Sequence, residues 1–275
     1  MTGCKPSCFR LFSELIPVLI LITNDDGIHS AGLQALTDRL QSFGRVAVVA
    51  PDRERSAIGR ALTLHAPLRA EEIAKDHWAV SGTPTDAVNL GIQALLQEKP
   101  DLVVSGINKG GNMGDDLTYS GTVAAAMEAT LMGVPAIAVS LAGQSFKYDD
   151  FAEAARVAEV LATTVLDHGL PADTFINVNV PANKPLGMRL TRQGKRIYED
   201  AVVQSRDPRG RSYYWIGAGE LGFQNLEGTD FHAVNKGYVS VTPLHLDLTN
   251  YAAIDRLRQW QLEDISLNAG DKGPA

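Results

Sequence analysis

The stretch Leu19–Gly27 has the sequence LILITNDDG, in which a continuous apolar run ends abruptly at two adjacent aspartates. Such a run, bounded by polar turn residues, is typical of a strand buried on both faces in the middle of a parallel sheet. Asp25 and Asp26 would then lie at the carboxyl end of that strand, where open α/β sheets bind their ligands. The stretch therefore predicts an α/β fold with a polar site at one edge of its sheet.

Two interpretations of the aspartate pair are open from these residues alone. Two like charges this close repel each other, and a bound divalent cation would remove the repulsion. Alternatively, Asp and Asn are favoured in solvated turns and at helix N-termini, where they bind no metal. The segment by itself favours neither.

The composition limits the class of protein. A chain of 275 residues, 45% hydrophobic and 21% charged, fits one large α/β domain or a core with a smaller appendage. A net charge of −7 argues against a partner that is a nucleic-acid polymer, because binding one needs a basic surface. Small phosphorylated substrates remain open, since a metal ion and a few local cations can hold them.

The N-terminus predicts an extension at residues 1–17, before the first strand. Its apolar part resembles a signal peptide only faintly, because Glu14 and Pro17 interrupt it, and it is too short to span a bilayer. The only cysteines, Cys4 and Cys8, could form one local bridge at most, which favours a reducing compartment. We therefore expect a cytoplasmic protein with no membrane partner.

From residue 18 to about residue 140, short apolar runs alternate with amphipathic stretches, as in a parallel sheet with crossover helices. A further amphipathic helix is expected at 151–167. In the stretch 62–69 apolar and polar residues alternate, which predicts an extra strand at an edge of the sheet or in a hairpin. The expected strands are 19–23, 46–50, 62–69, 78–80, 101–105 and 135–140, and the expected helices are 31–43, 84–96, 121–132 and 151–167.

Beyond residue 175 the pattern changes to short β-like runs separated by polar, glycine-containing loops. The segment 192–236 is rich in Arg, Tyr and Gly, which predicts a protruding arm rather than more sheet. The expected division of the chain is an extension at 1–17, an α/β core at 18–180, a β-rich arm at 181–250, and a C-terminal helix and tail at 251–275.

Three further segments could carry chemistry. After the second strand, Ser56 offers a hydroxyl oxygen to a hard cation, and Arg53 or Arg55 could meet a phosphate; a charged surface loop is the alternative. The segment 105–116 holds four glycines, which let backbone N–H groups approach a ligand, and Asn108 adds an amide oxygen. This segment fits neither the Walker loop nor the dinucleotide fingerprint. The third segment, 119–122, precedes a helix whose N-terminus suits an anion, with Ser120 as its cap.

These candidate side chains share one chemistry. Carboxylate, hydroxyl and amide oxygens suit Mg²⁺ or Mn²⁺ rather than zinc. The sequence has no cysteine–histidine cluster with zinc spacing and no Gly-x-Ser-x-Gly elbow of an esterase. A divalent cation next to a phosphate-binding loop is therefore the arrangement that the residues favour.

Five motifs resemble those of the SurE family, the stationary-phase survival proteins, which are metal-dependent nucleoside-monophosphate phosphatases. The motifs occur in the same order and with the spacing expected for that family, over about residues 18–250. They are Asn24–Gly27, Ala50–Ser56, Ser81–Pro84, Gly106–Gly114 and Tyr119–Thr122. Five agreeing motifs are far more specific than any one of them.

The resemblance implies a Rossmann-like, mostly parallel sheet with helices on both faces and a C-terminal arm that is exchanged between subunits of a homodimer or homotetramer. It implies one divalent cation per subunit, Mg²⁺ or Mn²⁺, held by Asp25, Asp26, Ser56 and Asn108. The expected phosphate-binding residues are Asn24, Asn112, Ser120, Gly121 and Thr122. Lys109 and Gly111 fall at positions that vary in the family and receive no role.

The function expected from this set is hydrolysis of nucleoside 5′-monophosphates to nucleoside and phosphate, with 3′-monophosphates and short polyphosphate as further substrates. Asp25 and Asp26 are the expected catalytic residues, and either could accept the proton of the attacking water. Phosphatases that work through a phospho-aspartate place a second Asp where this chain has Gly27, which favours water as the nucleophile.

Two other functions were weighed against hydrolysis. A non-catalytic sensor of nucleotide or metal would use the same site without turnover. A dinucleotide-dependent oxidoreductase is disfavoured, because the turn after the first strand lacks the glycine fingerprint.

Overall fold

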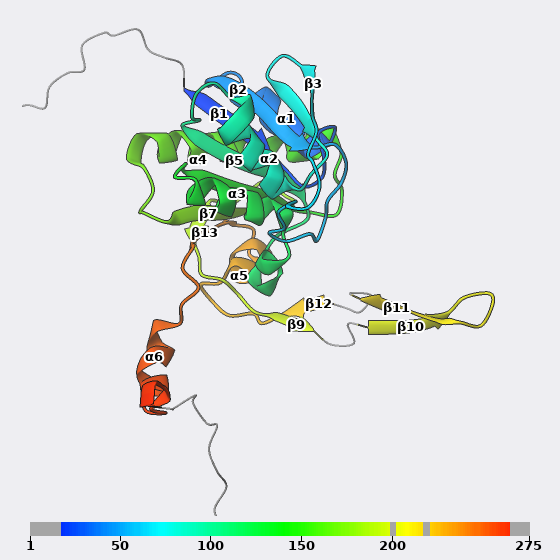
Figure 1. The fold of residues 1–275 in the computed structure, drawn as a ribbon, viewed down its shortest axis with the longest axis vertical. Coiled ribbons are helices and arrows are strands. Elements are labelled where there is room, and N and C mark those ends of the chain that lie inside the picture. Colours follow the sequence, from blue (N-terminus) through cyan, green and yellow to red (C-terminus); the bar gives the residue numbers. More distant parts are fainter. Residues whose placement is uncertain (1–17, 199–201, 217–220, 265–275) are drawn as a thin grey trace, which may run out of the picture.

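The computed structural model describes residues 18–198, 202–216 and 221–264, and its centre is a nine-stranded sheet (Figure 1). The strand order is β3-β4-β2-β1-β5-β6-β7-β13-β8. The bounds are β1 (Leu19–Thr23), β2 (Arg45–Pro51), β3 (Ala70–Ala74), β4 (His77–Val80), β5 (Leu102–Lys109), β6 (Ala136–Ala142), β7 (Thr174–Pro181), β8 (Met188–Leu190) and β13 (Val239–His245).

The pairing of the strands is mostly parallel. From β4 through β2, β1, β5 and β6 to β7 every neighbour is parallel, whereas β3–β4 and β7–β13 are antiparallel. The chain moves from β1 outward to β2 in one direction and later adds β5 on the other side of β1. The crevice between β1 and β5 is therefore the topological switch point, where such sheets bind ligands.

Helices cover both faces of the sheet, as the sequence predicted. On one face, α1 (Ala31–Leu40) and α4 (Ala152–His168) pack against a core that includes Ile20 and Ile22. On the other, α2 (Pro84–Leu90) and α3 (Gly121–Leu131) pack against a core that includes Leu21. Successive side chains of a strand point to opposite faces, so a strand buried on both needs an unbroken apolar run. The predicted α/β class is confirmed.

The helix starts follow local capping chemistry. Ser120 caps α3, and Thr83 and Asp86 form a capping box at α2 with Pro84 in the first turn. The single predicted helix 84–96 is divided, because α2 ends at Leu90 and a π-helical turn, Gly91–Leu95, follows it. The remaining short helical turns are Gly114–Thr118, Tyr148–Phe151 and Leu262–Asp264.

The predicted strand at 62–69 is wrong. This segment has no strand, and the edge hairpin starts at Ala70. The reason lies in the start of α2, where Asp86 accepts hydrogen bonds from the backbone N–H and the hydroxyl of Thr63 (2.9 and 2.6 Å) and the Thr83 hydroxyl donates to the Ala61 carbonyl (2.7 Å). The segment is thus held by a helix N-terminus rather than by a neighbouring strand.

Two antiparallel pairs make up much of the C-terminal region: β9 (Arg196–Tyr198) with β12 (Leu221–Phe223), and β10 (Val202–Arg206) with β11 (Ser212–Ile216). Figure 1 shows the β10–β11 hairpin extending away from the sheet, and α6 (Tyr251–Arg258) projecting in a different direction. The helix α5 (Asp230–Asn235) packs against β13. Although β13 lies within the range expected for the arm, it belongs to the main sheet.

Two expectations from the sequence, the extension and the domain division, stay predictions. The extension at 1–17 lies outside the described residues, and the division of the chain into domains stays a prediction. None of the helices within the described ranges combines the length and the apolar content needed to cross a bilayer.

Close packing of α1 on β5 determines where the first loop after β1 lies. A Cβ atom on Gly32 would come within 2.0 Å of the Ile107 carbonyl oxygen and 3.0 Å of the Phe151 ring. A backbone carbonyl cannot move out of the way as a flexible side chain can. Only glycine therefore allows the start of α1 to lie against β5.

We expect Gly32→Ala to destabilise the protein by about 2 kcal/mol or more, since overpacking would push α1 off the sheet. Thermal unfolding measures this. Gly143→Ala is the matched control, because a Cβ there meets its nearest atom at an ordinary 3.4 Å. Equal melting temperatures for the two variants would contradict the packing argument.

Candidate metal and phosphate site

The loop after β1 is held by the side chain of Asn24. Its amide oxygen accepts from the Gly27 N–H (3.2 Å), and its amide nitrogen donates to the Gly27 carbonyl (3.1 Å) and to the Ser30 hydroxyl (2.7 Å). Gly27 has φ +97°, a conformation that favours glycine. Asn24 thus links the aspartate pair to the start of α1, and its predicted contact with phosphate stays a prediction.

Asp25 faces the N-terminus of α3. Its Oδ1 accepts a hydrogen bond from the Thr122 hydroxyl at 2.5 Å, and the residue is only 4% exposed. A Cβ on Gly121 would lie 2.8 Å from the Asp25 Cβ, so this close approach needs glycine. Burial raises the pKa of Asp25 to about 6; the charge of Asp26 adds to the rise, and the Thr122 hydrogen bond opposes it.

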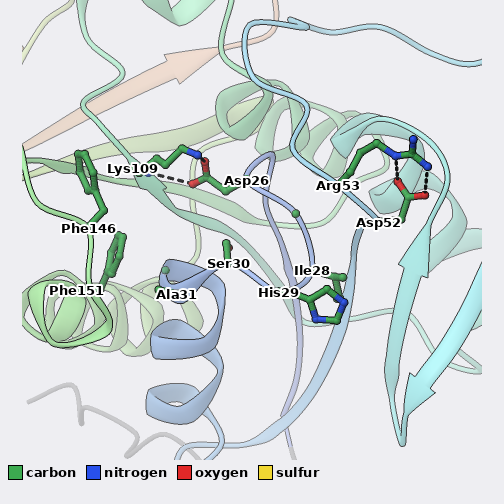
Figure 2. A pocket seen from close by; sticks show the side chains of 12 residues that line it. Asp26, Ile28, His29, Ser30, Ala31, Asp52, Arg53, Lys109, Phe146 and Phe151 are labelled. Atoms are coloured by element: carbon green, nitrogen blue, oxygen red, sulfur yellow. Dashed lines mark hydrogen bonds and ion pairs between the residues drawn. The ribbon is translucent and has the colours of Figure 1, made fainter.

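Asp26 faces the end of β5, on the other side of the loop. The Lys109 N–H donates to Oδ2 at 3.1 Å, and the Lys109 ammonium lies 3.3 Å from Oδ1 (Figure 2). Burial raises the pKa of Asp26, and the contacts with Lys109 oppose the rise. Although Oδ1 is buried and lies near the ammonium, it has no hydrogen-bond partner.

These features fit a hard cation. A buried carboxylate oxygen with no hydrogen bond is a ready ligand, and a divalent charge would offset the burial that raises both aspartate pKa values. Among the described residues, no three His, Cys, Asp or Glu side chains come together as a metal-binding group. The predicted set therefore depends on the neutral oxygens of Ser56 and Asn108 as well as on the two carboxylates.

The loop that carries Ser56 is attached to the aspartate pair through the backbone. The Arg55 N–H donates to the Asp25 carbonyl at 2.7 Å, which brings the next residue, Ser56, to the same edge of the sheet. The Ser56 side chain is exposed, and its hydroxyl donates to Glu54 at 2.8 Å. Binding a cation would require the hydroxyl to turn away from Glu54.

The two arginines of this loop have other partners. Arg53 forms two hydrogen bonds with the Asp52 carboxylate (2.8 and 2.7 Å), and an Arg55 guanidinium nitrogen donates to the Ser81 carbonyl (3.2 Å). In this structure the arginines therefore stabilise the loop, and their expected contact with phosphate stays a prediction.

Asn108 lies at the end of β5, where the strand is irregular. The register with β6 shifts between Ser105 and Asn108, and such bulges redirect side chains at sheet edges. Gly106 has φ +141°, and a Cβ there would lie 2.3 Å from the Val139 carbonyl oxygen. The Asn108 amide nitrogen donates to the Gly110 carbonyl at 2.8 Å, which leaves the amide oxygen as the end suited to a cation.

The start of α3, with its Ser120 cap, lies beside Asp25. The Ser120 hydroxyl accepts from the Val123 N–H at 3.1 Å, as predicted for an N-cap. The first backbone N–H groups of a helix have no partners within it, and the helix dipole favours an anion there. Gly121 and Thr122 supply such groups, so one helix turn contacts a proposed metal ligand and can also meet a phosphate.

Asn112 is buried in a hydrogen-bond network that the sequence did not reveal. Its amide side chain donates to the Ser140 hydroxyl (2.9 Å), its N–H donates to the Asn179 side chain (2.8 Å), and its carbonyl accepts from Asn177 and Asn179 (both 2.9 Å). The network holds the glycine-rich loop against β7. The signal that could have shown it is the alternation of asparagine with apolar residues in residues 175–180.

Asp230 is a second buried residue that sequence reasoning missed. It accepts hydrogen bonds from the Gly114 N–H (2.8 Å) and the Gly194 N–H (2.9 Å), and so joins the glycine-rich loop to the base of the arm. Burial raises its pKa, and these backbone hydrogen bonds oppose the rise.

A pocket of about 350 Å³ opens beside Asp26, on the α1 side of the sheet. Figure 2 shows Lys109 and Asp26 near the Phe146 and Phe151 rings, with His29 and the Asp52–Arg53 pair on the other side of the view. Asp26 thus faces a space that a ligand can enter, whereas Asp25 is enclosed by α3.

The fold and the position of the site are typical of one class: α/β proteins that bind a ligand at the carboxyl edge of a parallel sheet. Comparison with known families narrows the class. The family model described as survival protein SurE matches residues 20–200, and the chain belongs to the SurE family.

Individual relatives are similar over almost the whole chain. The chain is 62% identical to 5′-nucleotidase SurE of Syntrophotalea carbinolica over 89% of this chain and 98% of the relative. It is 59% identical to 5′-nucleotidase SurE of Geobacter sulfurreducens over 93% of this chain and 98% of that relative. The crystal structure of the SurE protein from Aquifex aeolicus has a TM-score of 0.80 at 48% identity, covering 88% of this chain and 99% of that one.

We expect Asp25→Asn to stabilise the metal-free protein at pH 8 but not at pH 4. Because the folded-state pKa is raised, the stability linked to Asp25 is full below its ordinary pKa of 3.8 and is lost as the pH rises through about 6. Because the asparagine amide does not ionise, the variant does not lose this part of the free energy of unfolding, which is at most about 3 kcal/mol.

Thermal unfolding in EDTA at the two pH values measures the difference, and Asp149→Asn, at an exposed position, is the control. Equal destabilisation of Asp25→Asn at both pH values would show that the carboxylate is not strained by burial.

Proposed function

We propose that this protein hydrolyses the phosphate ester of nucleoside 5′-monophosphates with the help of a divalent cation held by Asp25, Asp26, Ser56 and Asn108. The observation that supports the proposal is the 2.5 Å hydrogen bond from the Thr122 hydroxyl to Asp25, because it joins a proposed metal ligand to the start of α3, where the helix dipole favours an anion. The name 5′-nucleotidase, which both close relatives carry, supports the substrate class.

Different residues of the chain would bind the phosphate and accept the proton. When bound, a divalent cation would polarise a phosphoryl oxygen and lower the pKa of a nearby water by several units. The N–H groups at the start of α3 and the Ser120 and Thr122 side chains would stabilise the phosphoryl oxygens. Asp26, rather than Asp25, lines the open pocket, so its carboxylate is the one placed to accept a proton from the attacking water.

The finer features of the activity belong to the same proposal. The oxygen-only donor set favours Mg²⁺ or Mn²⁺, with one ion per subunit. Nucleoside 3′-monophosphates and short polyphosphate carry the same reacting group and are candidate further substrates.

We expect phosphate release from 5′-AMP and 5′-GMP with Mg²⁺ or Mn²⁺, and none in EDTA. Asp25→Asn should lower kcat/KM by at least about a hundredfold, because it removes a carboxylate ligand of the cation that would stabilise the reacting charge. Asp149→Asn should leave the rate unchanged, since that exposed carboxylate is not part of the site.

An inorganic phosphate assay with 5′-AMP, 5′-GMP, 3′-AMP and tripolyphosphate measures both the activity and its substrate range. Tight metal-dependent binding of nucleotide without turnover would contradict hydrolysis and favour the sensor. Full activity in EDTA would contradict the proposal that hydrolysis requires a divalent cation.

We also propose that the β10–β11 hairpin mediates self-association into a dimer or tetramer. The side chains of Tyr214, Trp215 and Ile216 are 61%, 62% and 85% exposed, although successive residues point to opposite faces of the strand. An isolated two-stranded hairpin is marginally stable in water, so one with apolar residues on both faces needs a partner. A second copy of the chain, which brings the same apolar strand, fits this need.

We expect the double substitution Trp215→Ser and Ile216→Ser to lower the molar mass in solution to that of one chain. Size-exclusion chromatography with light scattering measures the mass. Arg209→Ser, an exposed change on the loop of the same hairpin, is the control that should keep the wild-type mass. A wild-type protein that is already a single chain would overturn the proposal.

A cytoplasmic location is part of the proposal as well. Two cysteines in 275 residues, both within the first ten, give no framework of disulfides that an oxidising compartment would favour. The net charge of −7 supports a small phosphorylated substrate over a nucleic-acid polymer as the partner.

A further inference from the structure

Lys109 follows Asn108 at the end of β5 and makes contacts that the resemblance did not lead us to expect. Its ammonium lies between two carboxylates, 3.3 Å from Asp26 Oδ1 and 2.9 Å from Glu54 Oε2. The Asp26 side chain is 4% exposed and the Glu54 side chain is 53% exposed. One cation thus bridges a buried carboxylate of the proposed metal site and a carboxylate on the surface.

The two contacts of Lys109 differ in kind. The contact with Glu54 is a hydrogen bond, whereas Asp26 Oδ1 lies close to the ammonium but has no hydrogen-bond partner. A lysine side chain is cationic at neutral pH, and the Glu54 carboxylate lies within hydrogen-bond distance of this ammonium. The ammonium can therefore leave Asp26 and remain paired with Glu54.

We propose that Lys109 is a built-in counter-cation that competes with the divalent metal for Asp26 Oδ1, and that Glu54 is the residue toward which its ammonium withdraws when the metal binds. This inference rests on the proposed metal site and deepens it. Lys109 is thus a positioning residue, which affects metal binding through its contact with Asp26. Glu54 affects metal binding in turn through its contact with Lys109.

The physical argument has two parts. Without metal, a buried carboxylate needs a nearby positive charge, and within the described residues Lys109 is the cation paired with Asp26. With metal, two cations would share one oxygen, and their mutual repulsion weakens metal binding. Removing the ammonium should therefore have opposite effects on the two states: a less stable metal-free protein and a tighter metal complex.

The test compares Lys109→Met with the wild type. Methionine keeps much of the length of the side chain and removes its charge. We expect titration of Mn²⁺ into the EDTA-stripped full-length protein to give a dissociation constant at least about fivefold lower, which is the effect of a unit charge about 4 Å away even when it is screened as in bulk water. The melting temperature of the metal-free protein should fall.

Lys109→Arg should stay near the wild type in both measurements, because it keeps a charge that can reach both carboxylates. Lys75→Met, at an exposed position next to the β3–β4 hairpin turn, should change neither. A general effect of losing one positive charge would appear in the Lys75 variant too.

Glu54→Gln probes the other half of the inference. Without Glu54 the ammonium has only Asp26 as its partner, so the Mn²⁺ dissociation constant should rise. In the Lys109→Met background the same change should have little effect, because no ammonium is left to hold and the glutamine amide oxygen can still accept from the Ser56 hydroxyl. Equal effects of Glu54→Gln in both backgrounds would show that Glu54 acts on the metal directly, and would overturn its assigned role.

The outcome for Lys109→Met separates this inference from the proposed function. If Mn²⁺ binds with unchanged affinity while the KM for 5′-AMP rises, Lys109 contacts the substrate and the inference is wrong, although the metal site stands. If no variant, and not the wild type either, binds Mn²⁺, both the inference and the metal-dependent function are wrong.

Discussion

Asp25 and Asp26 place two negative charges at the end of a strand that is buried on both faces, where little water can solvate them. The surrounding elements supply the compensation that water does not. Thr122 donates to Asp25 from the start of α3, and Lys109 lies against Asp26 at the end of β5. The pKa of Asp25 is raised to about 6, because the effect of burial outweighs that of the Thr122 hydrogen bond.

The compensation is possible because the topology brings separate segments to one edge. β1 and β5 are neighbours at the switch point, so the loops that follow them meet although they are about eighty residues apart. Glycine permits the close approaches: Gly32 lets α1 lie on β5, and Gly121 lets α3 reach Asp25. The aspartate charges can be compensated only if neighbouring elements approach them closely, and glycine permits that approach.

Much of this architecture could be predicted from the sequence, because local chemistry determines it. The unbroken apolar run at 19–23 indicates two-sided burial, and Ser120 and Thr83 are recognisable helix caps. The wrong strand at 62–69 reflects the opposite case, in which alternation was real but a distant residue, Asp86, held the segment.

The parts of the site that sequence did not reveal depend on partners far along the chain. Asn177 and Asn179 hold the Asn112 backbone, Asp230 joins the glycine-rich loop to the base of the arm, and Lys109 bridges Asp26 and Glu54. Their residue types are ordinary for a strand or a loop. Only three-dimensional proximity shows what they do.

The central claim is that one hard cation is held between the end of β1 and the end of β5. A crystal of the full-length protein soaked in Mn²⁺, with anomalous scattering recorded at the manganese edge, tests it most directly. The account predicts one anomalous peak per subunit, about 2 Å from oxygens of Asp25, Asp26, Ser56 and Asn108. A peak elsewhere, or none at this edge of the sheet in a protein that hydrolyses nucleotides, would contradict it.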